Sequence, residues 1–286
     1  MRPALRPLSS PRLPGARADM GRVITITSGK GGVGKTTATA NISAALAALG
    51  HRVVCIDADI GLRNLDVVLG LENRIVYDLV DVVEGRCKLR QAMIRDKRLE
   101  ELYLIPAAQT RDKSAVSPKD MKRVCEELTK DFDFVIIDSP AGIERGFKNA
   151  IAPADEVVIV TNPEVSAVRD ADRIIGILEA EQKGPAKLVV NRINKELVNR
   201  GDMLAVADVL ELLAVDLIGI VPDDQAVLVS TNRGAPIALD ARSRTGQAFR
   251  DIARRLTGEQ VPFISANGGG GIMGRLSKLM RTGGEK

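Results

Sequence analysis

A glycine-rich loop, placed between an apolar strand pattern and a helical pattern, constrains this chain more than any other feature. The loop matches G-x-x-x-x-G-K-[ST] and consists of Gly29, Lys30, Gly31, Gly32, Val33, Gly34, Lys35 and Thr36. It follows a strand expected at residues 23–27 and opens a helix expected from about residue 36 to 49. Glycines let the backbone curl so that its N–H groups point at phosphate oxygens, and the helix dipole favours negative charge there. The loop therefore predicts a nucleotide-phosphate site.

The rest of the chain alternates between strand-like and helical patterns. Further strands are expected at residues 53–57, 102–105, 134–138, 156–160, 188–191 and 217–221, and helices at 118–130, 165–181, 203–213 and 241–256. This alternation predicts an α/β fold with a single doubly wound, mostly parallel sheet and helices on both faces. Aromatic residues make up only 2% of the chain, so Val, Ile, Leu and Ala must fill the core.

Side chains suited to a Mg-nucleotide complex lie in the loop and at two strand ends. Lys35 is expected to contact the β- and γ-phosphates, and Thr36 to offer its hydroxyl to Mg²⁺. Asp57 and Asp138 each close a strand pattern, which places them at the carboxyl edge of a parallel sheet, where such folds bind ligands. Because aspartates at strand ends also serve as caps, their assignment to the metal depends on the nearby loop.

Charge and cysteine content argue against several classes of protein. Residues 1–19 and residues 272–286 each carry a net charge of +3. Because the formal net charge of the whole chain is +4, the middle of the chain carries −2. A body that coats DNA is therefore not implied, and the scarcity of aromatic residues disfavours base-stacking modules. Cys55, Cys87 and Cys125 are too widely spaced for a disulfide framework or a paired metal site, and indicate buried or incidental thiols.

The two ends of the chain differ from its body. Residues 1–19 fit either a short organelle transit peptide or an extension before a start at Met20. The body is expected to span 20–264, followed by a flexible Gly-rich linker at 265–271 and a helix at 272–283. That helix opposes apolar Ile272, Met273, Leu276, Leu279 and Met280 to basic Arg275, Lys278 and Arg281. The pattern favours an anionic membrane surface, with a helix packed on the body as the alternative.

Lys30 is a second lysine within the loop, and cradling a single nucleotide does not require it. The stretch from Lys30 to Thr37 resembles the deviant Walker A loop of the MinD/ParA ATPase family. The resemblance implies a SIMIBI-like P-loop NTPase fold that holds ATP and Mg²⁺ between two subunits, with Lys30 reaching the nucleotide of the partner. Carried over by position, Asp59 orients the water that attacks ATP; it lies just past a strand end, where a carboxylate can accept a hydrogen bond from water.

Further strings resemble the MinD branch of this family, and the resemblance runs over about residues 21–263. They are residues 57–66, 138–144, 161–164 and 200–204. The resemblance implies adenine contacts from Asn191, Pro222 and Asp223 and a membrane-targeting helix at the C-terminus. It also implies ATP hydrolysis to ADP and phosphate, a homodimer in the ATP state, a MinC-type division inhibitor and a MinE-type activator as partners, and control of septum placement. The expected location is the cytoplasmic face of the bacterial inner membrane, or the plastid stroma and inner envelope if residues 1–19 are a transit peptide.

Four other functions are compatible with a P-loop but fit this sequence less well. A ParA-type DNA-partition ATPase would need a basic body. A redox protein like the nitrogenase iron subunit would need cysteines near the segments after Asp57 and Asp138. A flagellar-placement regulator is disfavoured by the MinD-like strings, and a small-molecule kinase by the lack of a second substrate motif.

Overall fold

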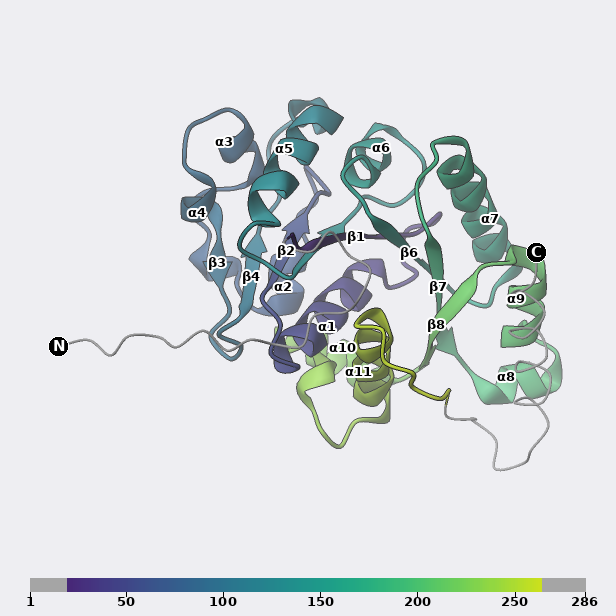
Figure 1. Ribbon diagram of the computed structural model, residues 1–286. Coiled ribbons are helices and arrows are strands. Elements are labelled where there is room, and N and C mark those ends of the chain that lie inside the picture. The colour runs from purple at the N-terminus through teal and green to yellow at the C-terminus, as the bar shows by residue number, and fades with distance from the viewer. Residues whose placement is uncertain (1–19, 264–286) are drawn as a thin grey trace.

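The fold is built on one eight-stranded sheet (Figure 1). The computed structural model describes residues 20–263. The strands lie in the order β3-β4-β2-β5-β1-β6-β7-β8, and β3 alone among the described strands runs antiparallel, against β4. Their bounds are β1 Arg22–Thr27, β2 Val53–Asp57, β3 Ile94–Arg95, β4 Leu102–Ile105, β5 Phe134–Asp138, β6 Glu156–Thr161, β7 Ala186–Ile193 and β8 Asp216–Pro222. The expected fold class, a mostly parallel doubly wound sheet, is confirmed.

Helices cover both faces of the sheet (Figure 1). One face carries α1 (Lys35–Ala48), α2 (Leu65–Leu69), α10 (Gln225–Asn232) and α11 (Arg244–Leu256). The other carries α3 (Leu79–Val83), α5 (Pro118–Leu128), α6 (Arg145–Ile151), α7 (Val165–Ala180) and α9 (Val206–Leu213). Alternate strand residues feed the two layers: Ile24 and Ile26 of β1 pack with α1, whereas Val23 packs toward α5. The short α4 (Leu89–Ala92) and α8 (Lys195–Arg200) lie in connections.

Several expected helix boundaries are wrong by a few residues because capping decides them. The helix expected at 203–213 begins at Val206, because the Asp208 carboxylate accepts a hydrogen bond from Ala205 N. The helix expected at 241–256 begins at Arg244, because Ser243 Oγ caps the first turn through Gly246 N. The sequence pattern also did not predict α2, α6 or α10, because their short apolar stretches fit a strand period as well as a helical one.

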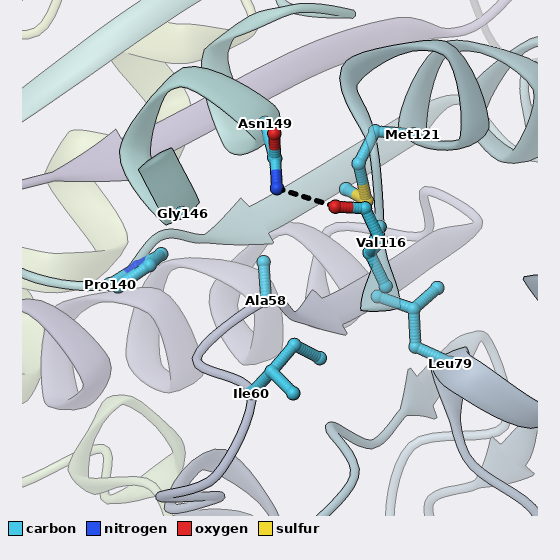
Figure 2. A pocket seen from close by; sticks show the side chains of 8 residues that line it. All are labelled: Ala58, Ile60, Leu79, Val116, Met121, Pro140, Gly146 and Asn149. Carbon is cyan, nitrogen blue, oxygen red and sulfur yellow. Dashed lines mark hydrogen bonds between the residues drawn. The ribbon is translucent and has the colours of Figure 1, made fainter. Parts of the chain in front are cut away.

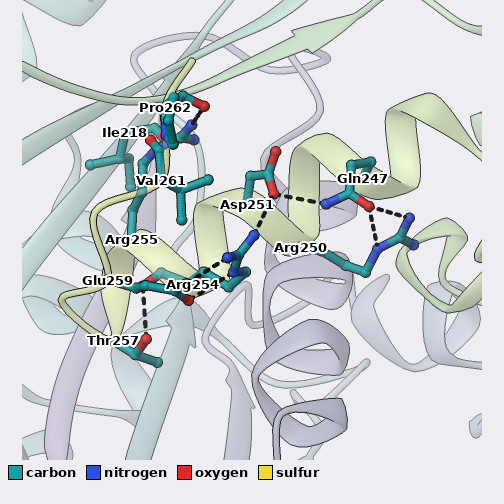
Figure 3. A network of polar contacts seen from close by, with 10 residues as sticks. All are labelled: Ile218, Gln247, Arg250, Asp251, Arg254, Arg255, Thr257, Glu259, Val261 and Pro262. Atoms are coloured by element: carbon teal, nitrogen blue, oxygen red, sulfur yellow. Dashed lines mark hydrogen bonds and ion pairs between the residues drawn. The ribbon is translucent and has the colours of Figure 1, made fainter. Parts of the chain in front are cut away.

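The chain after α11 is fixed against the sheet by Arg255 (Figure 3). Its guanidinium donates to the carbonyl oxygens of Ile218 in β8 (2.9 Å), Val261 (3.0 Å) and Pro262 (3.1 Å), and lies 3.9 Å from the ring centroid of Phe263. The expected extension at 1–19, the linker at 265–271 and the helix at 272–283 lie outside the described residues. Within residues 20–263, no helix is long and apolar enough to cross a membrane.

Candidate nucleotide site at the carboxyl edge of the sheet

The glycine-rich loop joins the end of the central strand β1 to the start of α1. Gly32 and Gly34 have φ values of +80° and +93°, which L side chains rarely adopt. A Cβ at Gly34 would also lie 2.4 Å from Asn191 Nδ2, so both the backbone conformation and the lack of space require glycine at this position. Gly34 is the N-cap of α1 and no side chain caps this helix, so its first N–H groups are left to a ligand or solvent. The loop thus has the form of a phosphate cradle.

Lys35, Thr36 and Asp138 form one cluster at the floor of this loop, in which Lys35 and Asp138 are buried and Thr36 is half-buried. Lys35 Nζ lies 2.8 Å from Asp138 Oδ1 and 3.3 Å from Thr36 Oγ1. The Thr39 hydroxyl donates to the same carboxylate oxygen at 3.0 Å. Side-chain exposure is 7% for Lys35 and 1% for Asp138, so the pair is shielded from water. The structure therefore brings together three residues that were expected at the phosphates and the metal.

Asp57 shapes the loop that carries Asp59. Its carboxylate accepts hydrogen bonds from the backbone N–H groups of Asp59 (3.0 Å), Asn64 (3.1 Å) and Leu65 (3.1 Å). Asp57 is paired in register with Asp138 across β2 and β5. Burial, and then the nearby Asp138 charge, raise the pKa of Asp57 to about 7. Asp57 thus organises the loop after β2, and its direct role toward a metal stays a prediction.

The donor set fits Mg²⁺ held mainly through phosphate and water. Among residues 20–263, no cluster of three or more His, Cys, Asp or Glu could hold a metal ion. Mg²⁺ keeps several waters and commonly uses one or two carboxylates with substrate phosphates. Thr36 Oγ1 and the Asp138 carboxylate, both in contact with Lys35, supply oxygen atoms of that kind. The residues present therefore fit a Mg-nucleotide complex.

The loops after β2 and β5 rest on a common, tightly packed floor (Figure 2). The floor encloses a cavity of about 10 Å³, large enough for at most about one water molecule. Pro140 of the β5 loop packs so closely on Gly146 of α6 that a Cβ there would lie 2.6 Å from Pro140 Cγ. Asn149 of α6 donates to the Val116 carbonyl at 2.7 Å. Ala58 and Ile60 of the loop after β2 line the same cavity as Pro140 of the loop after β5. A shift of one loop must therefore disturb the packing under the other.

Lys30 lies apart from the buried cluster, on the exposed side of the loop. Its Nζ is 3.5 Å from Glu164 Oε2 and 3.3 Å from Ser166 Oγ, at the start of α7. The side chains of Lys30 and Glu164 are 44% and 51% exposed. Two lysines of one loop thus have different environments: Lys35 is buried against Asp138, whereas Lys30 is accessible from outside.

The residues expected at the adenine lie at the ends of β7 and β8. Asn191 is buried and its Nδ2 donates to Val33 O at 2.7 Å, so the side chain supports the phosphate loop. Pro222 ends β8, and the exposed Asp223 follows it, with its N–H donating to Ile193 O at 3.0 Å. Contacts of these residues with adenine stay a prediction. The expected membrane residues, from Ile272 to Met280, lie outside the described part of the chain.

Sequence reasoning missed two polar residues of this site. Thr39 lies one helical turn after Lys35, on the same face of α1, and the i, i+4 spacing was a usable signal. Glu164 was recognised only as part of a MinD-like string, and nothing in its spacing indicated the contact with Lys30. Both residues add polar atoms to lysines that the loop pattern had already identified.

Comparisons with known proteins agree with this geometry. The family model described as an AAA domain matches residues 21–188. The septum site-determining protein MinD of Bacillus subtilis is 59% identical over 246 residues, which cover 85% of this chain and 92% of that protein. Among solved structures, the MinC:MinD cell division protein complex of Aquifex aeolicus has a TM-score of 0.81 at 51% identity, covering 86% of this chain and all of that one.

A third relative was solved with a nucleotide and a metal. The septum site-determining protein MinD of Pyrococcus horikoshii, complexed with Mg-ADP, has a TM-score of 0.75 at 30% identity over 83% of this chain and 96% of that one. This relative agrees with the nucleotide and Mg²⁺ expected from the loop. The family match, the extent of identity and the shared fold show that this chain belongs to the MinD family of septum site-determining P-loop ATPases.

Proposed function

We propose that this chain is an ATP-driven switch that dimerises on ATP, attaches to the membrane through its C-terminal segment and helps to place the division septum. Membership of the MinD family supports the role in septum placement. The different environments of Lys30 and Lys35 support the switch, because one lysine is accessible to a second subunit while the other belongs to the cradle. The accessibility of Lys30 is the observation that carries the proposal.

In the proposed reaction the chain positions a water molecule against ATP. The loop N–H groups and Lys35 hold the phosphates and favour the charge that builds up on them. Thr36 and Asp138, whose oxygen atoms both contact Lys35, would hold Mg²⁺, which would neutralise phosphate charge when bound. Asp59 accepts a hydrogen bond from the attacking water, and Asp57 holds the Asp59 backbone in place. Hydrolysis then releases ADP and phosphate.

A second subunit is proposed to complete the site. Leu62 and Ile143, on the loops after β2 and β5, and Val165, at the start of α7, are all exposed. Apolar side chains exposed around a charged site are typical of an interaction surface. When a second copy covers them, Lys30 of each subunit leaves Glu164 and reaches the nucleotide of the other. ADP lacks the γ-phosphate that draws the two subunits together.

Membrane binding is proposed to follow dimerisation because one tail binds weakly. Burying five apolar side chains yields several kcal/mol at roughly 25 cal/mol per Å², and three basic residues add about 1 kcal/mol each near anionic lipid. Ordering the segment costs on the order of 10 kcal/mol. Two tails on one dimer gain from effective concentration. The dimer at the cytoplasmic membrane surface would recruit a MinC-type division inhibitor, and a MinE-type activator would trigger release.

Sedimentation with vesicles tests the proposal. The full chain is mixed with anionic vesicles and ATP or ADP, beside a truncation ending at Phe263 and the variant Lys30→Ala. The full chain is expected to sediment with the vesicles when ATP is present and not when ADP is present. The Lys30→Ala variant should keep its affinity for ADP and lose both dimerisation and vesicle binding. Equal sedimentation in all arms would refute the membrane switch. ATP-dependent binding to a DNA duplex instead would favour a ParA-type partition function.

A further inference from the structure

Two glycine turns, one after α2 and one after α10, are in direct backbone contact. Gly70 and Gly234 have φ values of +65° and +59°. A Cβ at Gly70 would lie 2.6 Å from Gly234 O, and a Cβ at Gly234 would lie 2.5 Å from Gly70 Cα. No side chain fits between the turns, so the ends of α2 and α10 are locked together at this point.

The Arg98 guanidinium binds both turns at once. It extends from the connection between β3 and β4, and donates to Leu69 O at 2.8 Å through Nη2 and to Gly234 O at 2.7 Å through Nη1. Asp96, whose side chain is fully buried, fixes the guanidinium at 2.7 Å. Burial acts to raise the pKa of Asp96, but the bonds and charge of Arg98 outweigh it and hold the pKa below its ordinary value. The fork of Arg98 is therefore charged, oriented and anchored.

The far ends of the same two helices lie at the two halves of the nucleotide site. Asp57 holds the start of α2 through the N–H groups of Asn64 and Leu65, in the segment that carries Asp59. Asp224 caps the start of α10 through Ala226 N at 2.8 Å, directly after the expected base-contacting residues. Each helix is short, so a displacement at one end is transmitted to the other.

We infer that Arg98 is a positioning residue, which couples the base-binding end of the site to the loop of Asp59 by locking α10 to α2. The inference rests on the proposed function, because it assigns a role in the same ATP hydrolysis. Binding of a base beside Asp223 restrains α10, and Arg98 and the contact between Gly70 and Gly234 extend this restraint to the end of α2. The start of α2 is held by Asp57, in the loop that carries Asp59. If the Arg98 hydrogen bonds to Leu69 O and Gly234 O served only stability, weakening them would leave the effect of nucleotide on α2 unchanged.

Hydrogen–deuterium exchange of the full chain, with and without Mg-ADP, measures this coupling. In the parent protein ADP should slow exchange in the loop at 29–37, in α10 and in α2. In Arg98→Ala, protection of the loop and α10 should remain and that of α2 should be lost. Arg98→Lys keeps the charge but cannot reach both carbonyls, so it should behave like Arg98→Ala. Arg90→Ala, which removes an exposed contact with Asp131, is the matched control.

Steady-state kinetics give the second readout. Arg98→Ala and Arg98→Lys should lower kcat by about 10-fold, as expected for a misplaced water-positioning loop, and change the ADP dissociation constant less than twofold. Full protection of α2 by ADP and an unchanged kcat in Arg98→Lys would overturn the inference, and that variant decides if Arg98→Ala does not fold. Failure of the parent protein to bind or hydrolyse ATP would instead count against the proposed function.

Discussion

Removing the Lys35 side chain should destabilise the protein even without nucleotide. Lys35→Ala leaves the Asp138 carboxylate, 1% exposed, with the Thr39 hydroxyl at 3.0 Å and the Asp57 carboxyl on the neighbouring strand. Removing one partner of a buried ion pair costs roughly 3–5 kcal/mol, because the remaining charge stays buried without compensation. We therefore expect the free energy of unfolding to fall by about 3 kcal/mol.

A matched control lies in the same loop. Lys30 is also 3.5 Å from a carboxylate, that of Glu164, but both side chains are about half exposed. Exposed pairs of this kind contribute about 0–1 kcal/mol, so Lys30→Ala should change stability little. The two lysines thus separate the effect of burial from the effect of sequence position.

Equilibrium urea unfolding at pH 7.5, in the absence of nucleotide and Mg²⁺, measures these differences. The double variant Lys35→Ala with Asp138→Asn should recover at least about 1.5 kcal/mol, because no uncompensated charge is left. Nucleotide binding should stay lost in both, which separates stability from function. A Lys35→Ala variant as stable as Lys30→Ala, or no recovery of stability when Asp138 is neutralised, would refute an energetic cost of burying the Asp138 charge without its partner.

Three further outcomes are expected. The pKa of Asp57 is raised to about 7 from an unfolded value near 3.8, so between these values the native state binds more protons than the unfolded state, and the contribution of Asp57 to stability should fall as the pH rises from about 4 to 7. The difference in free energy of unfolding between the parent and Asp57→Asn, measured in urea across this pH range, checks this, and a difference that does not change with pH contradicts it. Burial raises the pKa of Cys55 to about 12 and also raises that of Cys125, so a thiol reagent should label only Cys87 in the native protein and all three thiols in urea; rapid native labelling of all three would contradict this burial. Gly34→Ala should weaken Mg-ADP binding at least 10-fold in calorimetry, because φ is +93° and no room exists for a Cβ, and ordinary affinity would show that the loop tolerates one.

The sheet and the loop could be predicted from sequence because their signals are local and strong. Every parallel strand appears as an apolar run, and the loop combines fixed glycines with a preceding strand and a following helix. The edge strand β3 could not be found, because two residues carry no period. Its antiparallel pairing depends on β4 alone and leaves no trace in the pattern of Ile94 and Arg95.

The candidate site was predictable in its residues but not in its contacts. Residue types at strand ends indicated Asp57 and Asp138, yet the three N–H groups that Asp57 binds depend on how the following loop folds. The bond from Asn191 to Val33 joins positions 158 residues apart, and only the completed sheet brings them together. Tertiary hydrogen bonds of this kind have no sequence period to reveal them.

The order of the strands has an evolutionary consequence. β2 and β5, which end at Asp57 and Asp138, lie on one side of β1, whereas β7 and β8, which lead to the residues expected at the base, lie on the other. Mutations that alter base preference and mutations that alter turnover could therefore accumulate independently across most of the site. The contact between Gly70 and Gly234 connects the elements on these two sides of the site. In a lineage that diverges in nucleotide choice, Gly70, Gly234 and Arg98 should therefore change together, while the residues on the two sides of β1 vary independently of one another.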